Sequence, residues 1–244
     1  MTDYGFDTAS AVTDAIASAA TGYYGNGAWI RYFDPSPNAT TISSSKSNAQ
    51  SEVSAMTAYG GHHLCPITEP SQSNLETGST SLGASDASTF LTAVQNVVDW
   101  TSIGLPGSLV CYLCLESGNN LSTDYWNGWA TTVNAYSLRG TPFYAGLYIN
   151  PTNSSGACST VAEAGPGEEC YAIWTSTPEP CSRCLTKFAD LSGWLGTACS
   201  GLPSYMWQYG EYPGCASCGY TLPAPVDLDA ISSEYSALDY MLIL

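Results

Sequence analysis

The stretch Ser108–Glu116, SLVCYLCLE, has the pattern from which the fold of the whole chain is predicted. It is a short apolar run after Pro106-Gly107, which is typical of a buried strand. A carboxylate, Glu116, ends the run, and a polar loop leads to Ser122, a residue type favoured as a helix N-cap. The predicted helix covers Thr123–Leu138. A strand that ends in an acid and leads into a helix is the repeating unit of α/β barrels. In these barrels, catalytic groups lie at the carboxyl ends of the strands.

Other segments of the chain show the same alternation of strand and helix patterns. The predicted strands are Tyr4–Thr8, Ala28–Phe33, His62–Glu69, Ser108–Glu116, Pro142–Asn150, Cys170–Ser176, Ser204–Tyr209 and Val226–Ile231. The predicted helices are Ala9–Ala20, Ser47–Tyr59, a helix capped by Ser85, Thr123–Leu138 and Leu185–Ala198, with a loop over residues 151–168. This alternation implies a parallel sheet, so we predict a single-domain (β/α)8 TIM barrel over residues 1–232, with a doubly wound sheet as the alternative. Residues 233–244 are predicted to form a C-terminal helix or apolar tail.

The composition restricts the partners of the chain. Its 244 residues include five Lys and Arg against 21 Asp and Glu, a net charge of −16. This balance excludes nucleic acid, because a phosphate backbone requires a basic patch, and it disfavours anionic membranes and polyanionic substrates. No apolar run approaches the length of a membrane span, so no membrane insertion is predicted.

The cysteines favour an oxidising compartment. There are ten of them, an even and high number, so a secreted protein is predicted although the N-terminal residues show no secretory signal. The pairs Cys181-x-x-Cys184 and Cys215-x-x-Cys218 fit either two disulfides or a four-cysteine zinc site. The number of cysteines favours disulfides, so neither a metal nor a cofactor is predicted.

The remaining cysteines and the two histidines suggest structural roles. Cys158 and Cys170 bracket a predicted loop, which indicates a disulfide between them. His62 and His63 point to opposite faces of a strand and so cannot easily share one metal ion. Four other cysteines are predicted to be buried thiols: Cys65, Cys111, Cys114 and Cys199.

Acidic side chains stand at or near the ends of four predicted strands. They are Asp7, Glu69, Glu116 and Asp227. The carboxyl ends of barrel strands converge on one face, and glycoside cleavage requires two carboxyl groups, roughly 5–5.5 Å apart for retention and farther apart for inversion. We predict Glu116 as the general acid, with Asp7 and Asp227 as partner carboxylates that stabilise an oxocarbenium-like centre or hold a water. The alternative is that these acids pair with Arg31 or cap helices.

Aromatic and basic side chains complete the predicted site. Aromatic faces stack on sugar rings, and four such residues lie at or near the ends of strands five to seven: Tyr148, Trp174, Trp207 and Tyr209. Core packing is an equal alternative for Trp174 and Trp207. Arg31 lies inside a strand, where it needs a carboxylate such as Asp7 or Glu69, so a structural ion pair competes with substrate contact.

The ordered set of motifs resembles the glycoside-hydrolase-like TIM barrels related to family 25 lysozymes, and more closely the bacterial and fungal domain family DUF1906. The segments that carry the resemblance are Tyr4-Gly-Phe-Asp7-Thr, Trp29-Ile-Arg31-Tyr-Phe, Tyr112-Leu-Cys-Leu-Glu116, Tyr144-Ala-Gly-Leu-Tyr148, Trp207-Gln208-Tyr209 and Val226-Asp227-Leu-Asp229. The resemblance implies an extracellular protein that hydrolyses a cell-wall polysaccharide such as peptidoglycan or chitin. It places Gln208 among the substrate-binding residues, with Arg31, Glu69, Tyr148, Trp174 and Trp207.

One position departs from this family. The fourth strand of family 25 lysozymes ends in Asp-x-Glu, and the corresponding residues here are Cys114-Leu115-Glu116. The resemblance therefore implies the general acid Glu116 and the first-strand and last-strand aspartates Asp7 and Asp227, but Cys114 replaces an acid. This replacement favours a second hypothesis, a non-catalytic carbohydrate-binding or structural barrel. The apolar end Met241–Leu244 offers a surface for self-association, although packing against its own barrel is favoured.

Overall fold

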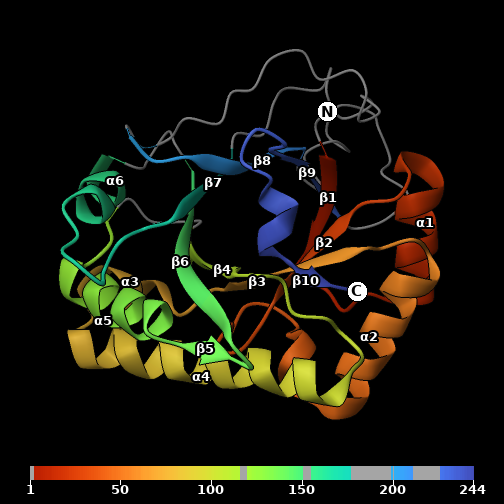
Figure 1. The fold of residues 1–244 in the computed structure, drawn as a ribbon, viewed down its shortest axis with the longest axis horizontal. Coiled ribbons are helices and arrows are strands. Elements are labelled where there is room, and N and C mark those ends of the chain that lie inside the picture. The colour runs from red at the N-terminus through yellow and green to blue at the C-terminus, as the bar shows by residue number, and fades with distance from the viewer. Residues whose placement is uncertain (1–2, 116–119, 151–154, 177–198, 200, 211–225) are drawn as a thin grey trace.

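The computed structural model describes the chain except residues 1–2, 116–119, 151–154, 177–198, 200 and 211–225. Its main sheet is a closed barrel, because β3 pairs with β4 and completes the ring (Figure 1). The barrel strands are β1 (Asp3–Thr8), β2 (Ala28–Tyr32), β3 (His63–Thr68), β4 (Leu109–Leu115), β6 (Thr141–Ile149), β7 (Ala172–Ser176), β8 (Ser204–Gly210) and β9 (Asp227–Ile231). The predicted α/β barrel is therefore present, and each predicted strand corresponds to one of these.

Helices cover the outside of the barrel. They are α1 (Asp14–Tyr24), α2 (Lys46–Ala58), α3 (Gln72–Thr77), α4 (Thr80–Trp100), α5 (Thr123–Asn134) and α6 (Ser155–Ala162), with the 3-10 turns η1 (Ile42–Ser44) and η4 (Ala237–Tyr240). In Figure 1, α4 and α5 lie side by side below the barrel, and α1 and α2 lie to its right. One apolar core fills the space between helices and strands, and a second fills the barrel. None of the described helices combines the length and apolar character needed to cross a membrane.

The direction of β9 differs from the prediction. The strands from β1 to β8 that neighbour one another in the ring run parallel, whereas β9 is antiparallel to both β1 and β8. The all-parallel barrel is therefore wrong at this strand, because a pattern of apolar residues does not record strand direction. As a consequence, the beginning of β9 lies at the carboxyl end of β1, and Asp227 is the register partner of Asp7.

The helices that differ from the prediction lie in segments rich in Ser and Thr, whose sequences resemble loops. α5 begins after Ser122 as predicted, and the Ser122 Oγ accepts the Tyr125 N–H at 3.3 Å. α4 begins much earlier than Ser85, because its cap is Ser79, and α3 forms between β3 and α4, where no helix was predicted. α6 lies in a predicted loop. The helix predicted over residues 185–198 lies outside the described residues.

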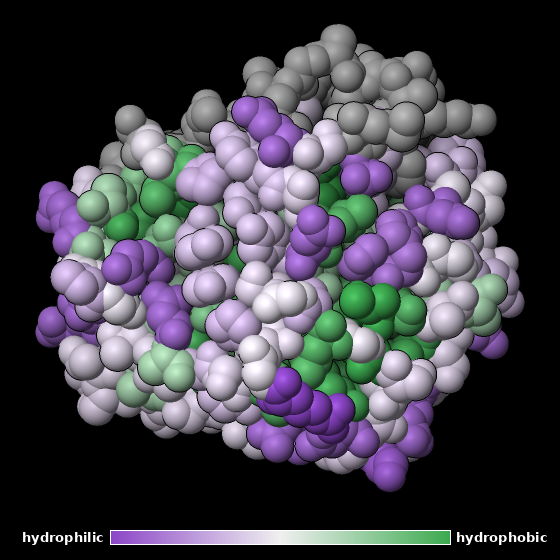
Figure 2. Space-filling view, viewed as in Figure 1, coloured by the Kyte–Doolittle hydropathy of each residue, from purple (hydrophilic) through white to green (hydrophobic). Residues whose placement is uncertain are grey.

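The C-terminal segment packs against its own barrel, as favoured. β10 (Leu242–Ile243) pairs with β3, and Ile243 bridges to Gly104 just before β4. Met241 and Ala237 are buried among side chains from the amino ends of the strands. On the face shown in Figure 2, hydrophobic residues gather where this segment ends, and Ile243 there is 46% exposed. Self-association through this end stays a prediction.

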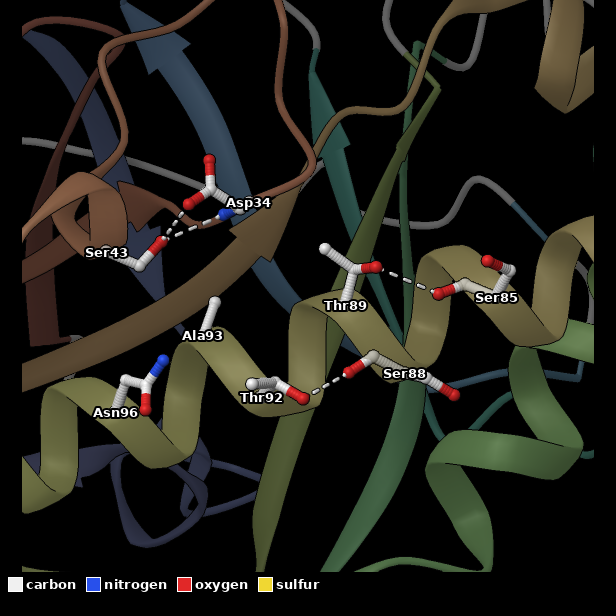
Figure 3. Close-up of a pocket in the computed structure, with 8 residues that line it drawn as sticks. All are labelled: Asp34, Ser43, Ser85, Ser88, Thr89, Thr92, Ala93 and Asn96. Carbon is white, nitrogen blue, oxygen red and sulfur yellow. Dashed lines mark hydrogen bonds between the residues drawn. The ribbon is translucent and has the colours of Figure 1, made fainter.

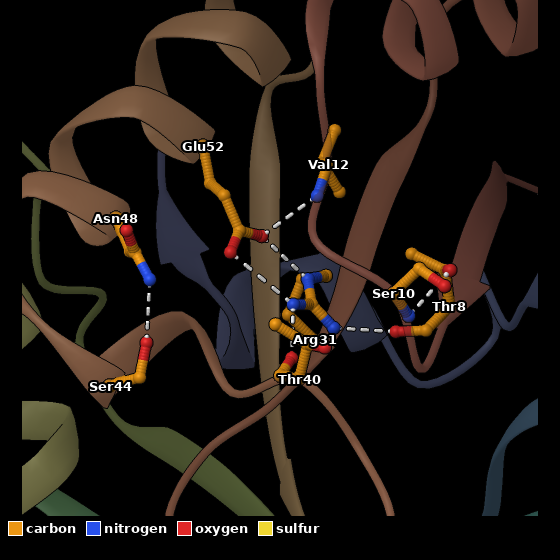
Figure 4. A network of polar contacts seen from close by, with 8 residues as sticks. All are labelled: Thr8, Ser10, Val12, Arg31, Thr40, Ser44, Asn48 and Glu52. Carbon is orange, nitrogen blue, oxygen red and sulfur yellow. Dashed lines mark hydrogen bonds and ion pairs between the residues drawn. The ribbon is translucent and has the colours of Figure 1, made fainter.

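A buried arginine joins the loops that follow β1 and β2. The fully buried Arg31 places its Nε 2.8 Å from the Glu52 Oε2 atom on α2 (Figure 4). Its other nitrogens donate to the backbone oxygens of Thr8 and Thr40, each at 2.6 Å. Glu52 also accepts the backbone N–H of Val12 at 3.0 Å. The partner is thus a helix residue, and the prediction of Asp7 or Glu69 was wrong.

The one disulfide among the described residues also differs from the prediction. Cys158 on α6 is bonded to Cys199, not to Cys170. The spacing in sequence failed here because α6 turns Cys158 towards the segment before β8. Cys199 is therefore not a thiol, while the predicted thiols Cys65, Cys111 and Cys114 are buried thiols, together with Cys170. The two CxxC pairs lie outside the described residues.

We expect Glu52→Gln to lower the free energy of unfolding by about 3–5 kcal/mol, because it leaves the Arg31 charge buried without its counterion. The matched control is Asp99→Asn, which removes the exposed ion pair with Arg139 and should cost at most about 1 kcal/mol. Urea unfolding of both variants measures the difference. Equal effects would show that the buried pair has no special structural role.

Peptide mapping without reduction should yield a fragment in which Cys158 is linked to Cys199. Because Cys170 is buried, it should react with an alkylating reagent only after the protein is unfolded. A linked fragment containing Cys158 and Cys170 would instead restore the pairing predicted from the sequence.

Candidate functional site

A network of buried polar side chains lies inside the barrel near the carboxyl ends of its parallel strands. The Gln208 Nε2 on β8 donates to the Asp7 Oδ2 on β1 at 3.1 Å and to the Asp227 Oδ2 on β9 at 3.2 Å. The Tyr148 hydroxyl on β6 donates to the Gln208 Oε1 at 2.9 Å. Gln208, Tyr148 and Asp7 are buried, whereas Asp227 is partly exposed. The partners of Gln208 therefore use both ends of its amide group.

The two aspartates of this network are close neighbours. Both Oδ2 atoms accept from the same amide nitrogen, so they lie no more than about 6 Å apart. This limit is compatible with the roughly 5–5.5 Å between carboxyl groups in retaining glycosidases. The antiparallel register of β1 and β9 produces this proximity, because Asp7 and Asp227 stand opposite each other across the two strands.

A third carboxyl group, Asp229, lies deeper in the barrel. It is fully buried, and its Oδ1 accepts the Trp174 Nε1–H at 2.9 Å. Its Oδ2 has no hydrogen-bond partner among the described residues. Burial raises the pKa of Asp229 well above its ordinary value, and the charge of Asp227 raises it further, while the bond from Trp174 acts in the opposite direction. These conditions favour the neutral acid.

Asp229 belongs to the motif Val226-Asp227-Leu-Asp229 but was not predicted as a site residue. The signal was present in the spacing, because residues two apart on a strand share a face. Asp227 was already a candidate, so a strand assignment alone was enough to bring Asp229 to the same side.

The predicted aromatic residues divide between the two cores. Trp174 lies inside the barrel, with its ring centroid 4.3 Å from that of Tyr148. Trp207 and Tyr209 are fully buried in the core between the barrel and the helices. The alternation of side chains along β8 explains this division, because Trp207 precedes Gln208 and so points to the opposite face. Packing thus accounts for Trp207, while Trp174 is part of the interior network.

Two other predicted site residues come from β2 and the end of β3, and a third lies outside the described residues. Glu69 follows β3 and is partly buried, and its backbone N–H donates to the Ser36 Oγ at 2.8 Å. Arg31 is engaged by Glu52 as described above. Glu116 follows β4 and lies outside the described residues. Among the residues that the structure describes, no group of three or more His, Cys, Asp or Glu is arranged to hold a metal ion.

A polar groove of about 440 Å³ lies on the outside of the barrel between α4 and the segment after β2 (Figure 3). Several of its polar side chains already make hydrogen bonds within the chain. The Asp34 carboxylate accepts from Thr41 and Ser43 at 2.9 and 3.0 Å, and the Thr89 and Thr92 hydroxyls donate to carbonyls one turn earlier in α4. The interior network is therefore the stronger candidate for a site.

No protein-family model and no curated protein sequence matches the chain. Solved structures do match its fold. An uncharacterized protein of B. stearothermophilus shares 20% identity with a TM-score of 0.72, over 98% of this chain and 99% of that one. The Tat-secreted protein Rv2525c of Mycobacterium tuberculosis, in complex with L-tartrate, shares 15% identity with a TM-score of 0.57, over 97% and 98% of the chains.

A third match is the spore cortex lytic enzyme SleM of Clostridium perfringens, with 13% identity and a TM-score of 0.53. The match covers 96% of this chain and 69% of SleM. At these identities the matches show a common fold. The chain therefore has a barrel of the kind found in a lytic enzyme and in a secreted protein.

The raised pKa of Asp229 makes a prediction about stability. A carboxyl group whose pKa is raised by folding stabilises the folded state most at a pH below its unfolded pKa, which is about 3.9. This stabilisation is lost as the pH rises towards the pKa of the folded state. Asp229→Asn keeps an acceptor for Trp174 and does not titrate. The stability of this variant relative to the wild type should therefore increase above pH 4, by at most about 1.4 kcal/mol per pH unit. Urea unfolding from pH 4 to 8 tests this, and a constant difference would contradict it.

Proposed function

We propose that the chain is a secreted glycoside hydrolase that acts on a cell-wall polysaccharide of the peptidoglycan or chitin type. The observation that carries this proposal is the pair of carboxylates, Asp7 and Asp227, bound to the single amide of Gln208. Glycosidic hydrolysis requires carboxyl groups that flank the scissile bond, and the carboxyl end of a barrel is where such groups converge.

Each member of the network has a chemical role in this proposal. Asp7 and Asp227 stabilise the positive charge of an oxocarbenium-like centre or hold the attacking water. The Gln208 amide donates to both carboxylates, and Tyr148 keeps that amide oriented. Glu116 supplies the proton to the leaving group. Supporting its assignment, β4 lies beside β6 with Cys114 in register with Tyr148, and Glu116 comes two residues later in the sequence.

Substrate contacts are proposed for residues that border this network. Tyr148, Trp174 and Gln208 form the floor below the two carboxylates, and Glu69 extends the site from β3. The contacts of Arg31 with Glu52 and of Trp207 with the outer core account for these two residues without a substrate. We therefore assign to Arg31 and Trp207 a structural role, in which they support the strands that carry the site.

Two further observations support a location outside the cell and a cell-wall substrate. The Cys158–Cys199 disulfide fits an oxidising compartment. Among proteins with the same fold, one is described as Tat-secreted and another as a spore cortex lytic enzyme. The excess of acidic residues further favours a substrate without dense negative charge.

A non-catalytic barrel that binds glycan is the second candidate. Cys114, which stands where family 25 lysozymes have an acid, is buried inside the barrel. A thiol there cannot replace a carboxylate in charge stabilisation. In this second candidate, Glu116 has no partner carboxylate on its own strand. The barrel then keeps its fold and its interior polar side chains, and it binds glycan without cleaving it.

Release of reducing ends from peptidoglycan and from chitin oligomers tests the two candidates. We expect the wild type to cleave one of these polymers, and Glu116→Gln to reduce the rate about 10²–10⁴-fold, as for loss of a general acid. Glu76→Gln, on the exposed face of α3, is the matched control and should keep the wild-type rate. Absence of cleavage by the wild type would favour the binding barrel.

A further inference from the structure

Five tyrosines gather at the end of the barrel opposite to the carboxylates. They are Tyr144 on β6, Tyr171 just before β7, Tyr205 on β8, and Tyr235 and Tyr240 of the C-terminal segment. We call this group the tyrosine cluster. Its members lie near the amino ends of β6, β7 and β8, where η4 covers the barrel (Figure 1). Pale side chains of intermediate hydropathy make up most of the surface over η4 in Figure 2.

Two rings of the tyrosine cluster are held flat against rings beneath them. Tyr171 is stacked on Tyr144, with centroids 4.1 Å apart and planes 9° apart. Tyr235 is stacked on Tyr205, with centroids 5.5 Å apart and planes 16° apart. The two outer rings, Tyr171 and Tyr235, are 39% and 40% exposed. Each therefore presents a rigid aromatic surface to solvent at little further entropic cost.

The fifth ring connects the two stacks and borders a hollow. Tyr240 lies 6.3 Å from Tyr171 and 5.4 Å from Tyr205, measured between centroids. It also lines a hollow of about 350 Å³, whose wall combines polar and apolar side chains: His63, Pro106, Ser108, Asp239, Met241 and Ile243. A concave surface with apolar walls, a few polar groups and adjacent aromatic rings is typical of a small-molecule or sugar subsite.

The charges around the tyrosine cluster restrict the class of ligand. The segments that supply the tyrosines, residues 141–149, 171–176, 204–210 and 232–244, contain no Lys or Arg. Glu234 and Asp239 beside them are exposed. A phosphate, a polyanion or an anionic membrane would be repelled, so an uncharged ligand fits. Separate rings among polar groups also suit sugars better than the continuous apolar contact of a second copy of the chain.

We propose that the tyrosine cluster and its hollow form a second glycan-binding site, which holds an uncharged glycan strand through sugar rings stacked on Tyr171 and Tyr235. The choice of glycan as ligand rests on the function proposed above. The site lies at the opposite end of the barrel from Asp7 and Asp227, so it binds polymer away from the position of cleavage and keeps the protein on an insoluble substrate.

Binding to insoluble chitin and to insoluble peptidoglycan, measured by depletion of protein from solution, tests this proposal. Tyr171→Ala combined with Tyr235→Ala should weaken binding to one of these polymers about tenfold or more. The matched control, Tyr23→Ala combined with Tyr59→Ala, removes two rings of similar exposure elsewhere on the surface and should bind as the wild type does. Tyr171→Phe combined with Tyr235→Phe keeps the stacking surfaces and should retain binding.

Thermal unfolding of all variants verifies that a loss of binding does not reflect loss of the fold. Weak binding by the alanine variant alone supports the proposal, whether or not the wild type cleaves the polymer. Equal binding by the alanine variant and the wild type overturns it, even if Glu116→Gln abolishes cleavage. Failure of the wild type to bind either polymer also overturns it, so its failure and that of the hydrolase proposal are distinguishable.

Discussion

The strand β9 lies between β1 and β8, and its placement there determines the geometry of the candidate site. This strand supplies hydrogen bonds to both neighbours and closes the sheet into a barrel, which leaves no open edge on the main ring. Because it runs antiparallel to both neighbours, its first residue lies at the carboxyl end of β1. Asp227 therefore faces Asp7, and Asp229 points into the barrel beside Trp174. The candidate site is thus a direct result of closing the barrel in this way.

The barrel accommodates buried ionisable groups in three different ways. Arg31 is neutralised by Glu52 and has backbone oxygens for its remaining donors. Asp7 and Asp227 both accept hydrogen bonds from the amide of Gln208. Asp229 accepts one hydrogen bond, from Trp174, and burial favours its neutral form. A buried charge requires a counterion, hydrogen bonds or a proton, and each solution occurs here within neighbouring strands.

The two ends of the barrel present different chemistry. Carboxylates and an amide occupy the carboxyl end, while the C-terminal segment closes the amino end and adds Tyr235 and Tyr240 to three tyrosines from the strands. The proposed separation of glycan binding from cleavage rests on this arrangement. The segment predicted as a C-terminal helix or apolar tail therefore fills one end of the barrel and also completes the tyrosine cluster.

Sequence patterns located the strands, because short apolar runs bounded by Gly, Pro and polar residues are local properties of the chain. The start of α5 after Ser122 was predictable for the same reason. The sequence patterns also pointed to Asp7 and Asp227, and the family resemblance pointed to Gln208, three residues that the fold brings into hydrogen-bonding contact. Tertiary structure alone decided the direction of β9, the pairing of Arg31 with Glu52 and of Cys158 with Cys199, and the burial of Trp207 behind the barrel wall. These features depend on which distant segments meet, and contact between distant residues leaves no trace in the local pattern of either segment.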